Sequence, residues 1–154
     1  MPADLDIPEY AVSPHVAPIV ALALIVVLDL LVPVPFLPRV VSLAVGIPVL
    51  MLGLGLWAWG VSGLLRPGES PNPAKATAQL VTSGPFRFSR NPIYTGGTIG
   101  LLGLALLLNT ATGTAVVVVL AFLVHNLALA EERYLEAKFG DQWREYRSRV
   151  RRWI

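Results

Sequence analysis

The sequence contains no cysteine and only two histidines among its 154 residues. Without cysteine the chain can form no disulfide and offers no thiolate for a metal ion or for nucleophilic catalysis. Two histidines, His15 and His125, are too few for a histidine-based metal centre, so we expect no metal site.

Charged residues are also scarce. They make up 14% of the chain, whereas hydrophobic residues make up 55%, and this balance is typical of membrane proteins. The first ten residues, MPADLDIPEY, lack the basic start and the cleavage site of a signal peptide, so we expect the first apolar segment to stay in the mature protein. We predict a single all-α integral membrane domain over residues 1–154.

Four apolar segments approach the length needed to cross a bilayer, which is about 20 helical residues. They cover residues of about 12–32, 40–65, 92–108 and 114–130. The second segment is rich in glycine, which favours close packing of one membrane helix on another. The connection between the third and fourth segments is short, so these two segments are predicted to form an antiparallel helical hairpin.

The positions of lysine and arginine predict the orientation in the membrane. If all four segments cross the bilayer, the N-terminus, the loop 66–91 and the tail 131–154 lie on one side, and that side holds every lysine and arginine except Arg39. The positive-inside rule makes this side the cytoplasm of a plasma or inner membrane. The net charge of +2 is then explained by topology and by anionic lipid headgroups, and we expect no nucleic-acid partner.

Residues 80–97 read LVTSGPFRFSRNPIYTGG, a polar segment that leads directly into the third apolar segment. Asn91 and Pro92 are typical of a helix start, with asparagine as the N-cap and proline as the first helical residue. The positive end of that helix dipole would point into the loop and suit a carboxylate or phosphate. The alternative is an ordinary, well-capped membrane helix flanked by interfacial arginines.

The tail reads EERYLEAKFGDQWREYRSRVRRWI. We expect the fourth helix to continue to Phe139 with Gly140 as its C-cap, and Asp141 to cap a short further helix. Apolar residues recur on that helix at helical spacing: Trp143, Tyr146, Val150 and Trp153. Such a helix either lies on the membrane surface as an anchor or covers the loop as a lid.

One face of the fourth helix is predicted to carry polar residues from within the membrane to its edge. His125, Leu129 and Glu132 follow one helix face from the middle of the membrane to its cytoplasmic edge. A histidine at that depth must face protein or water. His125 is therefore either a packing residue or the one candidate for an intramembrane base, and no other catalytic residue is assigned.

The two polar stretches together resemble the isoprenylcysteine carboxyl methyltransferase and phospholipid methyltransferase superfamily of small membrane enzymes. The hallmark of that superfamily is Gly-x-Tyr/Phe, then Arg-His-Pro-x-Tyr-x-Gly, then Glu-Glu after one apolar span. The resemblance covers about residues 75–154. It implies S-adenosylmethionine bound in a cytoplasm-facing pocket and a lipophilic methyl acceptor that arrives from the bilayer.

Carried over by position, the resemblance also implies a cofactor site. Its residues would be Ala78, Gln79, Leu80, Val81, Phe86, Arg90, Asn91, Pro92, Ile93, Tyr94, Glu131 and Glu132. A helix start suits the methionyl carboxylate, aromatic rings suit the adenine and the sulfonium, and a carboxylate suits the ribose hydroxyls or the amino group. Arg90 would either position the cofactor carboxylate or brace Glu132.

The sequence departs from the superfamily pattern at two positions. Asn91 stands where histidine is usual, which keeps hydrogen bonding but removes a titratable group. Leu127 stands where the prenylcysteine enzymes carry an arginine one turn before the first glutamate. A neutral, amine or thiol acceptor is thus favoured over a carboxylate acceptor.

Two other classes of protein remain open on the sequence. A membrane reductase of related architecture would bind NADPH, with Lys75, Arg87 and Arg90 on its phosphates, although the paired glutamates would repel that ligand. A non-enzymatic membrane scaffold would explain the hydropathy but would not explain the polar residues of the loop and the tail.

Overall fold

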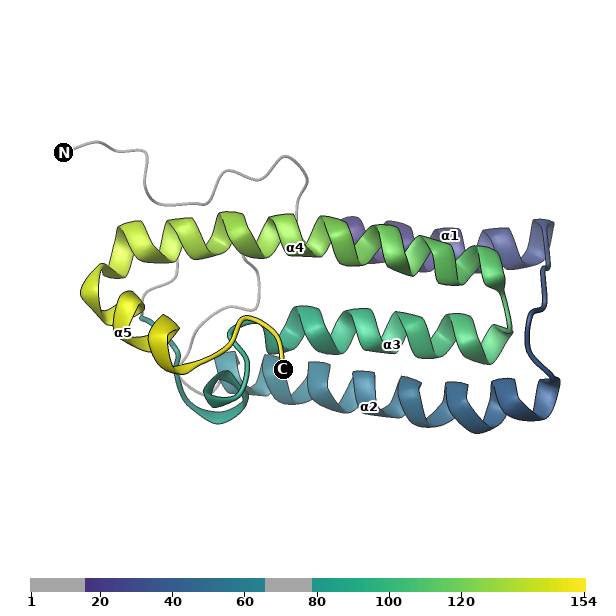
Figure 1. Ribbon diagram of the computed structural model, residues 1–154, viewed down its shortest axis with the longest axis horizontal. Coiled ribbons are helices and arrows are strands. Elements are labelled where there is room, and N and C mark those ends of the chain that lie inside the picture. The colour runs from purple at the N-terminus through teal and green to yellow at the C-terminus, as the bar shows by residue number, and fades with distance from the viewer. Residues whose placement is uncertain (1–15, 66–78) are drawn as a thin grey trace.

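The computed structural model describes residues 16–65 and 79–154. The described residues form five α-helices and one 3-10 turn (Figure 1): α1 (Val16–Leu31), α2 (Arg39–Leu65), η1 (Gly84–Arg87), α3 (Pro92–Leu108), α4 (Ala111–Phe139) and α5 (Asp141–Arg149). For these residues the prediction of an all-α protein is confirmed. Residues 12–15 of the first predicted segment, and residues 66–78 of the loop with the candidate Ala78, lie outside the described residues.

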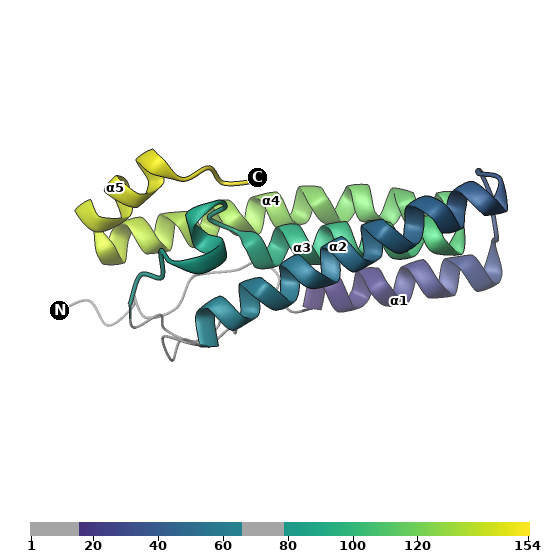
Figure 2. The same cartoon turned by 90° about the horizontal axis from the view of Figure 1, so that it is seen from below.

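The four long helices run side by side and alternate in direction (Figures 1 and 2). By length and composition α2 and α4 can each cross a membrane, whereas α1 and α3 are also apolar but shorter, at 16 and 17 residues. The second and third segments begin and end as predicted, to within one residue. The fourth helix begins at Ala111 and not at Thr114, because the hydroxyl of Thr110 accepts a hydrogen bond from the backbone N–H of Gly113 at 3.2 Å and caps the helix there.

Helices α2 and α3 pack backbone to backbone along a row of glycines. A Cβ atom on Gly53 would lie 2.1 Å from the backbone nitrogen of Gly100, and one on Gly103 would lie 2.2 Å from that of Leu50. No side chain fits into these spaces, so the glycines set the separation of the two helices. This contact fixes the position of the start of α3 relative to the end of α2.

The α1–α2 and α3–α4 connections are joined by Asn109, which adopts a left-handed conformation with φ of 62°. Its Oδ1 accepts hydrogen bonds from the backbone N–H groups of Phe36 and Leu37, and its Nδ2 donates to the carbonyl of Leu37 at 2.8 Å. The N–H of Ala111 bonds the carbonyl of Val34 at 3.0 Å. These bonds tie the two connections together and satisfy several of their backbone groups at the end of the bundle opposite α5.

At the other end, α4 extends beyond its neighbours and the chain folds back through Gly140 into α5 (Figure 1). Gly140 has φ of 52° and is the C-cap of α4, as predicted, but it also occupies the N-cap position of α5, so Asp141 is the first helical residue and not the cap. Trp143 and Tyr146 are buried against Phe86 of η1. Helix α5 therefore covers the described part of the loop, which is one of its two predicted roles, whereas a position on the membrane surface stays a prediction. The helix ends at Arg149 with Val150 as its C-cap, and Val150 packs against the same cluster, as expected. Trp153 lies beyond the helix and packs elsewhere, against residues of α1 and α4.

Candidate functional site

The start of α3 is held by its backbone and by the C-terminal residues. Asn91 occupies the N-cap position and Pro92 the first helical position, as predicted, but the side chain of Asn91 makes no capping hydrogen bond. Its Nδ2 instead donates to the carbonyl of Arg152 at 3.4 Å. The carbonyl of Asn91 accepts from both the N–H and the hydroxyl of Thr95, at 3.0 and 2.9 Å. The expectation of a side-chain cap was wrong because the amide is used in a long-range contact.

Tyr94 and Glu131 join the two motifs of the sequence. Tyr94 lies in the first turn of α3, and its hydroxyl donates a hydrogen bond to Oε2 of Glu131 on α4 at 3.0 Å. Among the described residues Tyr94 is the one hydrogen-bond partner of this carboxylate. Residues that are 37 positions apart in sequence thus form a polar pair between two packed helices.

Glu132 is held by two arginines. Its Oε1 and Oε2 accept hydrogen bonds from Nε and Nη2 of Arg152 at 2.8 and 2.9 Å, in a bidentate arrangement. Nη1 of Arg90 lies 3.3 Å from Oε2 of the same carboxylate. Bidentate pairing fixes the orientation of a carboxylate more tightly than a single hydrogen bond does. Hydrogen bonding to Glu132 raises the pKa of Arg152, with burial opposing the effect.

Arg90 is buried between Glu132 and Trp143. Its side chain is 8% exposed, and its guanidinium carbon lies 5.7 Å from the centre of the Trp143 ring. Burial lowers the pKa of Arg90, and the charge of Glu132 acts in the opposite direction. Nε and Nη1 have no hydrogen-bond partner among the described residues, so the charge of Glu132 and the ring face stabilise the cation. Of the two roles expected for Arg90, the structure displays the bracing of Glu132.

Much of the predicted loop site is apolar and packs under α5. The side chains of Leu80, Val81 and Ile93 lie against the cluster of Phe86, Trp143 and Tyr146. The hydroxyl of Tyr146 donates to the carbonyl of Phe86 at 2.7 Å, and burial raises the pKa of this phenol. Gln79 is exposed at the edge of this region. For these loop residues, contact with a cofactor stays a prediction.

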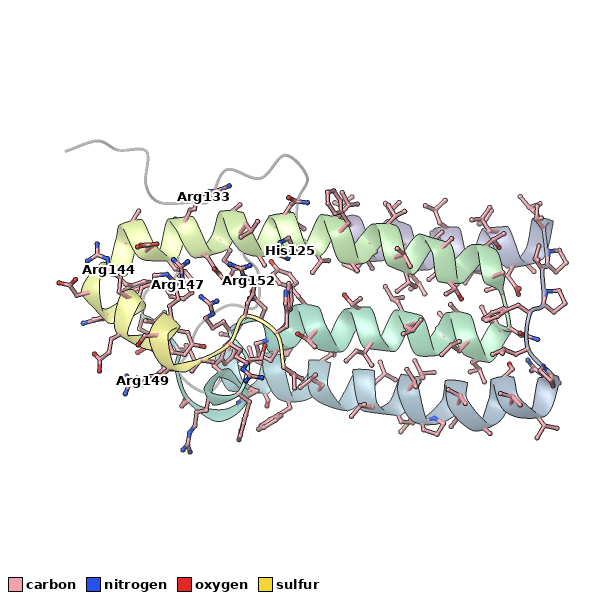
Figure 3. The ribbon with its side chains drawn as sticks, viewed as in Figure 1. His125, Arg133, Arg144, Arg147, Arg149 and Arg152 are labelled. Carbon is pink, nitrogen blue, oxygen red and sulfur yellow. The ribbon has the colours of Figure 1, made fainter. Side chains whose placement is uncertain are left out.

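His125 lies six residues before Glu131 on α4, and Figure 3 shows it at the end of the bundle where α5 and Arg152 lie. Its ring is 6.2 Å from that of Trp153, centre to centre, with the two planes tilted by 36°. Trp153 packs against a cluster formed by α1 and α4: Ala17, Ala21, Leu120 and Val124. The histidine is therefore placed at the boundary between the apolar bundle and the polar end of the molecule.

Two residues that hold the site together, Ser89 and Arg152, were not identified from the sequence. The hydroxyl of Ser89 donates to the carbonyl of Arg152 at 3.1 Å and accepts from the N–H of Asn91 at 3.1 Å. Arg152 itself looked like one of several basic tail residues. The run RVRRWI gave no signal to separate it from its neighbours, because its role depends on a contact 20 positions away with Glu132.

The comparisons with known proteins fit this arrangement. The family model described as phospholipid methyltransferase matches residues 41–142, and the chain belongs to this family. An uncharacterized protein of Haemophilus influenzae is 38% identical to it over 55 residues, which is 35% of this chain and 87% of that protein. No solved structure matches.

Membership in this family implies methyltransferase activity and a lipid substrate. The resemblance inferred from the loop and tail motifs is thereby confirmed at the level of the family. The apolar helices and the family together indicate an integral membrane protein.

Proposed function

We propose that the protein transfers the methyl group of S-adenosylmethionine to a lipophilic acceptor held in the membrane. The observation that carries this proposal is the hydrogen bond between Tyr94 and Glu131, because it brings the two motifs of the resemblance into contact at the polar end of an apolar bundle. The proposed acceptor classes are a phospholipid amine, an isoprenylcysteine-like group or another small lipophilic group.

The residues present fit the cofactor. Glu131 has one carboxylate oxygen bound to Tyr94, and a carboxylate in this setting can accept hydrogen bonds from an amino group or from ribose hydroxyls. The start of α3 supplies the positive end of a helix dipole for a carboxylate. Tyr94 places an aromatic ring in the first turn of α3, beside Glu131. Phe86 of η1 is buried under α5, and its contact with the cofactor is part of the proposal.

When bound, S-adenosylmethionine supplies an activated methyl group on a sulfonium. In this proposal Glu131 and Tyr94 orient the cofactor, and α5 keeps water away from the reacting atoms. In-line positioning and exclusion of water then supply most of the rate. His125 is the proposed base if the acceptor has to lose a proton, since it lies on the same helix toward the apolar bundle.

Among the proposed acceptor classes, a neutral, amine or thiol acceptor is favoured over the carboxylate of an isoprenylcysteine. Leu127, which stands where the prenylcysteine enzymes have an arginine, is buried and only 8% exposed. No cation at that position is available to bind an acceptor carboxylate. A carboxylate acceptor placed there would be desolvated without a partner, which is costly.

A reductase that binds NADPH is disfavoured because one of its candidate phosphate ligands, Arg90, is already paired with a carboxylate. Arg90 is buried in an ion pair with Glu132, Arg87 is exposed, and Lys75 lies outside the described residues. Calorimetry of the detergent-solubilised protein separates the possibilities. Binding of S-adenosylhomocysteine and not of NADPH is expected. Binding of NADPH alone would assign the reductase, and binding of neither would favour a scaffold.

A further inference from the structure

The last residues of the chain cross the proposed site. After α5, residues 150–154, which we name the C-terminal strap, run back between the start of α3 and α4 (Figure 3). The N–H of Arg90 donates to the carbonyl of Arg151 at 2.9 Å. The carbonyl of Arg152 accepts from Ser89 and Asn91. The backbone of the strap is thus bonded to three consecutive residues before α3.

The side chain of Arg152 makes the second connection of the strap. Figure 3 shows it directed toward α4, where it binds both oxygens of Glu132. One residue therefore bonds Asn91, three positions before Tyr94, through its backbone and Glu132, next to Glu131, through its side chain. Arg152 is thus hydrogen-bonded close to Tyr94 on one helix and close to Glu131 on the other.

The next residue, Trp153, adds an apolar contact to these polar ones. Trp153 packs against the cluster of α1 and α4 residues on which the ring of Tyr94 also packs. Trp153 of the strap and Tyr94 of α3 therefore rest on the same cluster, and the strap is attached both to the residues before α3 and to Glu132 of α4.

We propose that Arg152 is a positioning residue of the cofactor site, which sets the relative placement of Tyr94 and Glu131. This inference rests on the proposed function. Arg152 is suited to a role beyond stability. Its side chain is 24% exposed, and Glu132 keeps its ion pair with Arg90 when Arg152 is removed. The buried carboxylate of Glu132 then still has a cationic partner. We expect the main change to be in the relative placement of Tyr94 and Glu131.

The test is the affinity for S-adenosylhomocysteine of the full-length solubilised protein and of its variants. Arg152→Ala is expected to weaken binding by at least about fivefold. Arg152→Lys keeps the charge but loses the bidentate fork, and should restore part of the affinity. Arg149→Ala is the matched control, since Arg149 lies at the end of α5 in an exposed ion pair with Glu145, and its affinity should equal that of the wild type.

A double-mutant cycle separates positioning from general stability. If Arg152 acts through Glu131, the loss caused by Arg152→Ala should shrink in a Glu131→Gln background, because the contact it positions is already gone. Fully additive losses, or an unchanged affinity in Arg152→Ala, would overturn the inference. If Arg152→Ala does not fold, equal affinities of Arg152→Lys and the wild type would overturn it. A wild-type protein that fails to bind S-adenosylhomocysteine would overturn the proposed function itself.

Discussion

Glu131 and Glu132 are adjacent in sequence but have different partners. Successive residues of an α-helix point about 100° apart, so Glu131 meets Tyr94 whereas Glu132 meets Arg152 and Arg90. The sequence predicted the residue types and the elements that carry them. It could not predict this division, because the arginine that binds Glu132 most closely comes from the far end of the chain.

Exchange of each glutamate for glutamine should therefore have a different main effect. Glu131→Gln is expected to weaken binding of S-adenosylhomocysteine by about one to two orders of magnitude, the value of one charge-assisted hydrogen bond, with little loss of stability. Glu132→Gln leaves two arginines without their counter-charge and should lower the free energy of unfolding by about 3 kcal/mol. Calorimetry and thermal unfolding of both variants measure the two effects. Equal affinity of Glu131→Gln and the wild type would remove Glu131 from the site.

At the scale of elements, hydropathy and glycine content predicted the helices well. The bounds of α2 and α3 follow from apolar segments that end in polar or proline-containing connections, and Asn91–Pro92 marked the start of α3. The sequence left two roles open for α5, because a helix with tryptophan, tyrosine and arginine suits a membrane surface as well as a protein surface. Its contact with Phe86 depends on how the loop folds, which no local pattern contains.

The glycine contact of α2 with α3 provides a stability test with an internal control. Gly53→Ala places a Cβ atom 2.1 Å from the backbone of α3, so the helices must separate, and a loss of about 2 kcal/mol or more is expected. Gly55→Ala, two residues along the same helix, meets no atom within 4 Å and should be neutral or stabilising by about 0.5–1 kcal/mol.

The measurement is thermal unfolding of both variants in the same detergent. Equal melting temperatures of the two alanine variants would show that the close approach of α2 and α3 does not contribute to stability.

At the scale of the whole molecule, the polar end formed by α5, η1 and the C-terminal strap lies opposite the connection between α1 and α2 (Figure 1). The absence of native cysteine allows single cysteines to report the side of the membrane. Ser148→Cys and Pro35→Cys are both at exposed positions. With four spans and the basic end inside, an impermeant maleimide should label Pro35→Cys in intact cells and Ser148→Cys only after permeabilisation. Labelling of both in intact cells would contradict this topology.

The central claim is that the site built on Tyr94 and Glu131 transfers a methyl group to a membrane lipid. The most direct measurement supplies S-adenosylmethionine with a labelled methyl group to the solubilised protein, together with vesicles of phosphatidylethanolamine and total membrane lipid, and follows label in the lipid fraction. We predict that the wild type moves label into lipid and that Glu131→Gln does so at a rate at least about tenfold lower. Label that never enters the lipid fraction, or an equal rate in the Glu131→Gln variant, would contradict the claim.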